Sequence, residues 1–201
     1  MYAYLVDDDP LVLASLAATL GGRFEVQTFP AAEDFLGALD HLAPGVILVD
    51  LAMPGMDGST LHSELLARDA PMTVVFLTGA GGVTEAVDAM RRGAVDFLCK
   101  PIRRAELLAS MERAVDRQTR LMATRRRRTD VARLTERERQ VLQGLAAGAP
   151  SKIIAHHLGI SSRTVEMHRA RICDKLRAPT MGAIAIACEA GLIDVSAAYP
   201  T

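Results

Sequence analysis

Five side chains that suit phosphoryl chemistry follow short apolar runs in the first half of the sequence. In chain order they are Asp7, Asp8, Asp50, Thr78 and Lys100. Carboxylates that share a cleft repel one another unless a hard cation compensates their charge, and Mg²⁺ prefers oxygen ligands. A carboxylate beside such a cation can act as a nucleophile toward phosphorus and form an aspartyl phosphate. Because phosphoryl transfer mainly needs charge neutralisation and alignment, the set predicts a phosphoacceptor site.

Asp50 is the best candidate for the nucleophile because it stands alone at the end of a central predicted strand. We expect Asp7 and Asp8 to hold Mg²⁺ together with Asp50, and the backbone carbonyl of Ala52 to be a further ligand. The ammonium group of Lys100 and the hydroxyl group of Thr78 would then neutralise the charge of the phosphoryl group and align it. A single Asp after a strand is usually only a turn residue. Here, however, suitable polar residues follow four strands, and such a set is much harder to explain by turn residues alone.

The first 117 residues alternate apolar runs with amphipathic stretches. Runs such as 46–49 and 74–77 do not alternate with polar residues, as expected of strands that helices cover on both faces. The predicted strands are 2–6, 24–28, 45–49, 73–77 and 95–98. The predicted helices are 10–20, 31–41, 57–68, 83–92 and 103–117. Five such units predict an α/β flavodoxin-like, doubly wound parallel sheet with strand order 2-1-3-4-5, whose ligand site lies beyond the carboxyl ends of the strands.

Residues 1–117 resemble the receiver domain of two-component response regulators. The matching segments are Leu5–Asp9, Asp50–Gly58, Leu77–Gly79 and Gly93–Pro101. The resemblance implies that Asp50 is the phosphoacceptor and that Asp7 and Asp8 are the acidic pair. It also implies that Thr78 is the switch hydroxyl, that Lys100 contacts the phosphoryl group, and that the Lys100-Pro101 peptide is cis. Phe97 matches the family's switch aromatic, which moves inward when the hydroxyl turns toward the phosphoryl group.

The charges divide unevenly along the chain. Residues 1–117 hold 9 Lys and Arg against 17 Asp and Glu, a net charge of −8, whereas residues 118–201 hold 14 against 7, a net charge of +7. This asymmetry predicts two domains with different partners. The basic half suits nucleic acid, a membrane surface or an acidic protein, and charge alone does not choose among them.

The polar stretch 118–133 predicts a linker between a first domain, 1–117, and a second, 134–201. Its arginine run, Arg125–Arg128, is either a solvated tether or a source of extra contacts with DNA phosphates.

Several features predict a cytoplasmic protein without a membrane partner. No apolar run approaches the roughly 20 residues that a membrane span needs. The first residues lack the basic flank of a signal peptide. Cys99, Cys173 and Cys188 are odd in number and form no CxxC pair, which fits reduced thiols better than disulfides or a zinc site.

The second half predicts an all-α domain of four helices. Thr135 and Glu138 have the spacing of a capping box at the start of the first helix. Residues 151–177 have helix-turn-helix spacing, with a turn at 159–161. In the longer helix, the residues with core-facing spacing are Val165, His168, Ile172 and Leu176. The pattern alone leaves DNA binding and a merely solvated helix face about equally plausible.

If the longer helix enters a major groove, its exposed stripe meets base edges and phosphates. The residues that we expect to contact DNA are Lys152, Arg163, Thr164, Glu166, Met167, Arg169, Ala170, Arg171 and Lys175. The basic members would mostly bind phosphates and set the register. Glu166 would accept a hydrogen bond from a cytosine amine, and Met167 and Ala170 would touch thymine methyl groups.

Residues 134–190 are similar to the LuxR-type DNA-binding domain. The matching segments are Leu134–Leu142, Ala147–Ala155, Leu158–Arg169 and Lys175–Leu176. Together the two halves resemble the NarL/FixJ class of response regulators, most of all its FixJ branch. The resemblance implies a sensor histidine kinase, double-stranded DNA and RNA polymerase as partners. It also implies a homodimer that forms on phosphorylation.

The sequence therefore predicts a transcription regulator in which phosphorylation of Asp50 controls DNA binding, and not an enzyme with a separate substrate. One alternative is an aspartate-nucleophile phosphatase of the haloacid dehalogenase type, although Asp50-Leu51-Ala52 lacks the second Asp of that class. The other alternative is a degenerate receiver that dimerises without phosphate and leaves DNA binding constitutive. The complete set of reactive side chains argues against it.

Overall fold

The computed structural model describes residues 1–79 and 90–193. The chain divides into two compact units, Met1–Met122 and Ala123–Thr201. Within the described ranges, no helix is both long enough and apolar enough to cross a membrane.

The first unit is built on a parallel sheet of five strands in the order β2-β1-β3-β4-β5, as predicted. The strands are β1 (Tyr2–Val6), β2 (Glu25–Phe29), β3 (Gly45–Asp50), β4 (Met72–Thr78) and β5 (Asp96–Cys99). The helices are α1 (Pro10–Leu20), α2 (Ala32–Ala38) with the 3-10 turn η1 (Leu39–His41), α3 (Gly58–Ala67) and α5 (Arg104–Ala132). Most of the helix predicted at 83–92 lies outside the described residues.

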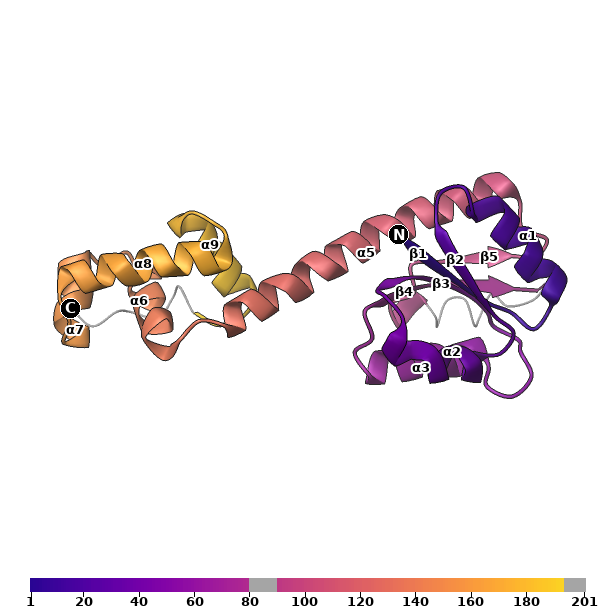
Figure 1. Cartoon of the computed structure of the whole chain (residues 1–201), viewed down its shortest axis with the longest axis horizontal. Helices are drawn as coiled ribbons and strands as arrows, with labels where there is room; N and C mark the ends of the chain where they lie inside the picture. Colours follow the sequence, from indigo (N-terminus) through magenta and orange to yellow (C-terminus); the bar gives the residue numbers. More distant parts are fainter. Residues whose placement is uncertain (80–89, 194–201) are drawn as a thin grey trace. The chain divides into compact units, whose positions relative to one another are not determined.

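Both faces of the sheet are covered, which explains why the central strands β1, β3 and β4 are almost entirely apolar. Every residue of β3 and β4 is buried. Helices α2 and α3 cover one face and α1 and α5 the other (Figure 1). In β3, Ile47 and Val49 pack toward α2 and α3, whereas Val46 and Leu48 pack toward α1 and α5. The alternation follows from the two-residue period of a strand.

Helix α5 does not end where the sequence predicts. The helix expected at 103–117 continues to Ala132, so the stretch predicted as a linker is helical. Gln118 lies within that stretch but is buried, with 1% of its surface exposed. The Thr73 hydroxyl donates to Gln118 Oε1 at 2.6 Å, and Gln118 Nε2 donates to the Pro71 carbonyl at 2.8 Å. These two hydrogen bonds hold α5 against the start of β4, one residue beyond the predicted domain edge.

Up to residue 193, the second unit contains four further helices around a small core. They are α6 (Glu136–Ala146), α7 (Ser151–Leu158), α8 (Ser162–Leu176) and α9 (Thr180–Glu189). Val131, near the end of α5, and Leu134 also belong to this core. The predicted capping box is present, because the side chains of Thr135 and Glu138 each bond the other residue's backbone N–H. Gly159 ends α7 with a positive φ of 64°, a conformation that favours glycine.

Candidate functional site

Three carboxylates meet at the carboxyl edge of the sheet. Asp7 follows β1 and is fully buried, Asp50 ends β3 with 6% exposure, and Asp8 is exposed. Because β1 and β3 are adjacent and in register, the two strand ends bring these side chains together. One oxygen of each carboxylate lies within 4.8 Å of the others. The structure thus assembles the acidic cluster that the sequence predicts.

Lys100 lies between two of these carboxylates. Its Nζ is 2.6 Å from Asp7 Oδ2 and 3.1 Å from Asp50 Oδ2. The residue directly follows β5, and the Lys100-Pro101 peptide is cis, as predicted. Burial alone would lower the pKa of Lys100, but its hydrogen bonds to Asp7 and Asp50 outweigh this effect and raise it. The lysine is therefore an ammonium cation at neutral pH.

Opposing influences act on the Asp50 carboxyl group, and together they raise its pKa. Burial raises the pKa of this carboxyl group and is the largest influence on it. The hydrogen bond and charge of Lys100 act in the opposite direction, as does the backbone N–H of Ala52, while the nearby charge of Asp7 adds to the rise. A further positive charge close to Asp50 would favour its ionised, nucleophilic form.

The acidic cluster fits a divalent metal ion in both chemistry and charge. Carboxylate oxygens are the hard ligands that Mg²⁺ prefers. With all three carboxyl groups ionised and Lys100 protonated, the cluster retains two negative charges, which a divalent cation would compensate. This arrangement is typical of a Mg²⁺ site.

Glu33, on α2, holds the loop between β3 and α3 in place, a role that the sequence pattern does not predict. Its Oε1 accepts the backbone N–H of Met56 at 2.7 Å. In the same loop, Gly55 has a φ of +76°, and a Cβ there would lie 2.6 Å from Glu33 Oε1. A Cβ on Gly58, the first residue of α3, would lie 2.3 Å from the Asp50 carbonyl oxygen. The loop that carries Ala52 is therefore closely fitted to its neighbours.

Within the described residues, neither predicted switch residue forms a side-chain hydrogen bond with the acidic cluster. The Thr78 hydroxyl donates to the carbonyl of Gly79 at 3.1 Å. Phe97 lies on β5, the edge strand, with 38% of its surface exposed. The Thr78 carbonyl accepts the backbone N–H of Lys100 at 2.7 Å, so the ends of β4 and β5 are joined next to the site.

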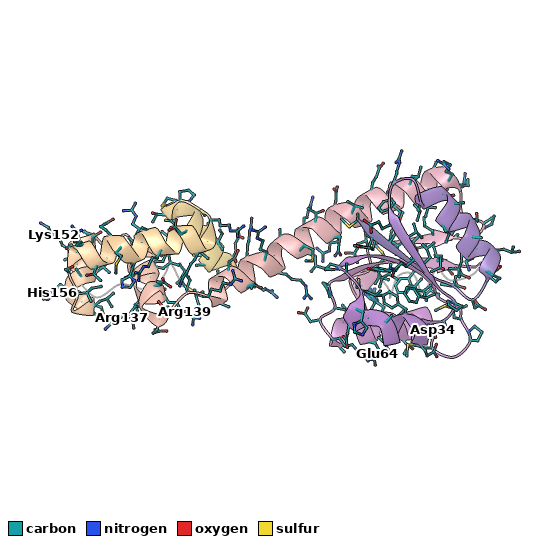
Figure 2. The ribbon with its side chains drawn as sticks, viewed as in Figure 1. Asp34, Glu64, Arg137, Arg139, Lys152 and His156 are labelled. Atoms are coloured by element: carbon teal, nitrogen blue, oxygen red, sulfur yellow. The ribbon has the colours of Figure 1, made fainter. Side chains whose placement is uncertain are left out.

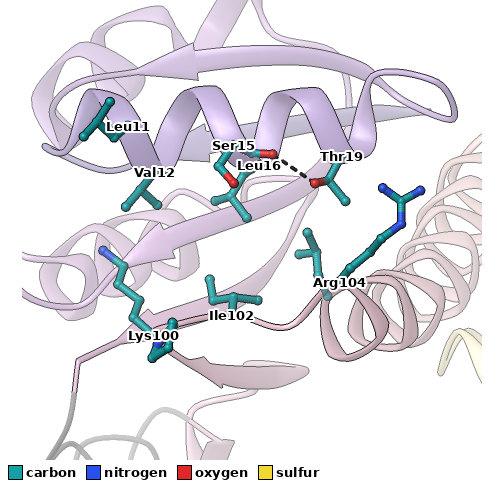
Figure 3. A pocket seen from close by; sticks show the side chains of 10 residues that line it. Leu11, Val12, Ser15, Leu16, Thr19, Lys100, Ile102 and Arg104 are labelled. Atoms are coloured by element: carbon teal, nitrogen blue, oxygen red, sulfur yellow. Dashed lines mark hydrogen bonds between the residues drawn. The ribbon is translucent and has the colours of Figure 1, made fainter.

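A groove of about 710 Å³ opens beside Lys100, between α1 and the start of α5 (Figure 3). Its lining is mostly apolar and includes Leu11, Val12 and Ile102. Leu11 is 77% exposed. Lys100 thus borders both this groove and the acidic cluster.

The second unit presents most of the predicted DNA-contacting side chains to solvent. In α8, Val165, Ile172 and Leu176 are buried as predicted, whereas His168 is only half-buried. The exposed members of the predicted set are Lys152, Arg163, Glu166, Met167, Arg169, Ala170 and Arg171. Lys152 lies on α7, as does His156 (Figure 2). Thr164 is half-buried, and its hydroxyl lies 2.8 Å from that of Ser161, the N-cap of α8.

Lys175 differs from the other predicted contacts. Its Nζ is 2.7 Å from Glu138 Oε2, and it donates to the Arg133 carbonyl at 3.1 Å. Glu138 is 2% exposed and needs a compensating charge, because an isolated buried carboxylate is costly. Lys175 therefore has an internal partner, Glu138, that the helix pattern of the sequence does not predict.

Comparison with known proteins agrees with both halves of this description. The family model "Response regulator receiver domain" matches residues 3–112, and the model "Bacterial regulatory proteins, luxR family" matches residues 132–186. The chain belongs to the two-component response regulators. This response regulator is a transcriptional regulator with a phosphoacceptor receiver and a LuxR-type DNA-binding domain, and not a classical enzyme. The receiver implies a histidine kinase partner, and the LuxR-type domain implies binding to DNA.

Individual relatives match the response regulator over most of its length. The transcriptional regulatory protein FixJ of Bradyrhizobium diazoefficiens is 37% identical over 199 residues, which cover 96% of this chain and 97% of FixJ. FixJ of Rhizobium meliloti is 40% identical over 184 residues, covering 89% and 90%. Among solved structures, the response regulator StyR matches with a TM-score of 0.70 at 34% identity, covering 94% of this chain and 98% of StyR.

Proposed function

We propose that a sensor histidine kinase phosphorylates Asp50 in the presence of Mg²⁺, and that the phosphoryl group controls DNA binding by the second unit. The observation that carries this proposal is the position of Asp50, whose carboxylate lies 3.1 Å from Lys100 Nζ and within 4.8 Å of Asp7 and Asp8. A lone carboxylate with a cation and a metal-binding pair beside it meets the charge requirements of phosphoryl transfer.

Each residue of the site has a distinct role in the proposal. Asp7, Asp8 and Asp50, with the Ala52 carbonyl, would hold Mg²⁺, which neutralises charge on the phosphoryl oxygens when it is bound. Asp50 Oδ would be the nucleophile. Lys100 would transfer its contact from Asp50 to the phosphoryl oxygens, since an ammonium follows the larger negative charge.

The same event would change the edge of the sheet. The Thr78 hydroxyl, which donates a hydrogen bond to the neighbouring Gly79 carbonyl, would turn toward the phosphoryl group. Phe97, now 38% exposed, would then move inward. Such coupling is a shift of population between two states of the receiver. We propose that the shifted state forms a homodimer through the altered surface.

The dimer would place two helix-turn-helix units on two DNA half-sites. Lys152, Arg163 and Arg171 suit phosphate contacts, and Arg169 and Thr164 would help to set the register. Glu166, Met167 and Ala170 suit base edges. Lys175 would hold α8 in place rather than contact DNA. We also propose, from the family alone, that the protein acts in the cytoplasm and meets RNA polymerase there.

The test compares the wild-type protein with Asp50→Asn, which removes the nucleophile and keeps the size of the side chain. With a small phosphodonor and Mg²⁺, the wild type should gain the mass of one phosphoryl group on Asp50, form a dimer and bind promoter fragments more tightly. Asp50→Asn should do none of these. Asp34→Asn, on the exposed surface of α2, is the matched control and should behave as the wild type.

Intact mass, peptide mapping, light scattering and gel shift measure these effects. Phosphodonor-dependent DNA binding by Asp50→Asn would contradict the proposal. Equal DNA affinity of the wild type with and without phosphodonor would instead favour constitutive binding.

A further inference from the structure

Four side chains from three helices form one connected network in the DNA-binding domain. The Ser151 hydroxyl, at the start of α7, donates to Glu166 Oε1 at 2.7 Å. Glu166 Oε2 lies 3.6 Å from an Nη of Arg169, one turn further along α8. Arg169 Nε in turn donates to Thr180 Oγ1 at 2.8 Å, at the first residue of α9.

We propose that Ser151 is a positioning residue that orients the Glu166 carboxylate for reading one base pair. Sequence preference at that base pair would then depend on a hydroxyl that contacts no base itself. This inference rests on the proposed function, in which α8 enters the major groove and Glu166 faces a base edge.

Glu166 is exposed, so its orientation is not fixed by burial. About half of its side chain is accessible (53%), as is 44% of that of Arg169. A free glutamate samples many rotamers in water, and fixing them on binding costs conformational entropy. A hydrogen bond that fixes the carboxylate beforehand lowers this cost and sharpens recognition. Ser151 supplies such a bond from another helix.

The Ser151 hydroxyl is not needed to cap its own helix. The N-cap of α7 is Pro150, and no side chain caps this end. Ser161 offers a contrast within the same motif, because it is the N-cap of α8 and accepts the Thr164 backbone N–H at 3.0 Å. Two serines that look alike in sequence therefore have different partners, and only Ser151 bonds to an exposed acidic side chain on α8.

The network leaves Glu166 able to accept a further hydrogen bond. Each carboxylate oxygen has two acceptor positions, and Ser151 occupies only one on Oε1. The amine of cytosine is the donor in the major groove that a carboxylate suits. Arg169, anchored on Thr180, lies near the second oxygen and offsets part of the negative charge that DNA phosphates would repel. The arrangement therefore favours a cytosine at the base pair that Glu166 faces.

The experiment measures base preference at every position of the binding site, using the phosphorylated full chain and a randomised DNA library. The variants are Ser151→Ala, which removes the hydroxyl, and Ser151→Thr, which keeps it. Glu166→Gln replaces the carboxylate with an amide. Ser162→Ala, at an exposed serine in the first turn of α8, is the matched control.

We expect Glu166→Gln to change the preferred base at one position, away from cytosine and toward adenine, because Gln pairs with adenine. Ser151→Ala should reduce discrimination at the same position by roughly 5- to 10-fold, at the lower end of the range for a single base contact. Ser151→Thr and Ser162→Ala should keep the wild-type preference. The dependence of affinity on salt should be the same for Ser151→Ala and the wild type, because no phosphate contact is lost.

Other outcomes distinguish a failure of this inference from a failure of the proposed function on which it rests. If the wild type selects a sequence and Ser151→Ala selects it equally well, the positioning role is wrong. A uniform loss of affinity with a shallower salt dependence would show that Ser151 binds a phosphate, and would also overturn the inference. If the wild-type protein selects no sequence at all, the proposed function itself fails. Circular dichroism shows whether each variant folds, and Ser151→Thr provides a test should Ser151→Ala unfold.

Discussion

Glu138 serves two structural purposes at the start of α6. Its side chain accepts the Thr135 backbone N–H at 2.7 Å, which completes the capping box, and it pairs with Lys175 of α8 at 2.7 Å. Burial alone would raise the pKa of Glu138, but the bonds from Lys175 and Thr135 outweigh burial and lower it. The carboxylate is thus stabilised by folding, and it links the first helix of the domain to the helix proposed to read DNA.

The lowered pKa of Glu138 predicts how stability depends on pH. A carboxyl group whose pKa is lower in the folded state stabilises the fold above its unfolded pKa, and this contribution is lost as pH falls through the folded pKa. We expect the DNA-binding domain to lose stability below about pH 5, near the pKa of an unfolded glutamate. Glu138→Gln should reduce this dependence, as measured by urea unfolding at several pH values. An unchanged pH profile in Glu138→Gln would contradict the assignment.

Lys175 provides a second test at the same pair. Lys175→Met should lower the free energy of unfolding by about 1–3 kcal/mol, because it leaves a buried carboxylate without its charged partner. It should leave the salt dependence of DNA binding unchanged. Arg171→Met, at an exposed position on the same helix, is the control. It should barely change stability but should reduce the salt slope by roughly one.

At the scale of residues, the sequence predicts the reactive groups better than the groups that support them. Asp7, Asp50 and Lys100 could be found because each follows an apolar strand, and strand ends converge in a parallel sheet. Glu33 and Ser151 could not be found in this way. Each bonds to a residue distant in sequence, over 23 and 15 positions respectively, and a Glu or Ser in the sequence carries no local sign of such a partner.

At the scale of elements, the described strands lie within one residue of their predicted bounds, whereas α5 is far longer than predicted. Strand ends are marked by a change from apolar to polar residues, and here the sheet edge and that change coincide. The arginine-rich stretch after residue 117 lacks such a mark, since polar residues suit a solvated helix and a tether equally well. Arginine has a high helix propensity, which favours the continued helix.

The burial of Gln118 predicts that α5 contributes measurably to the stability of the receiver. Gln118→Ala should lower the free energy of unfolding by about 1–3 kcal/mol, because it leaves the Thr73 hydroxyl and the Pro71 carbonyl without their present partner. Arg117→Ala, at the exposed neighbouring position, should change it by less than about 0.5 kcal/mol. Urea unfolding of the full chain measures both. If Gln118→Ala and Arg117→Ala were equally stable, the hydrogen bonds of Gln118 would not hold α5 against the sheet.

At the scale of the whole molecule, each unit has its own core. The first unit buries side chains on both faces of the sheet, and the second buries a separate set between its helices. The charge asymmetry of −8 against +7 predicted this division. That asymmetry reflects the different binding partners of the two units and says nothing about how their cores pack. The sequence could not predict that the boundary between the two units lies within α5, because the position of this boundary depends on which side chains each core buries.

Separate cores predict two unfolding transitions with different ligand responses. Mg²⁺ at about 100 times its Kd should stabilise the receiver by about 2.7 kcal/mol, since it binds the folded acidic cluster, and should leave the other transition unchanged. Target DNA should raise only the unfolding temperature of the DNA-binding domain. Differential scanning calorimetry at constant ionic strength measures both effects, with KCl as the control for Mg²⁺. A single transition that both ligands shift would contradict independent cores.

The close approach of α3 to Asp50 has a consequence for the interpretation of mutations. Gly58 has no functional group, yet a Cβ at this position would meet the Asp50 backbone oxygen at 2.3 Å. Any larger residue must displace either the helix or the strand end from which the nucleophile projects. A saturation mutagenesis screen for signalling would therefore rank position 58 among the chemically essential ones, although its intolerance is purely steric.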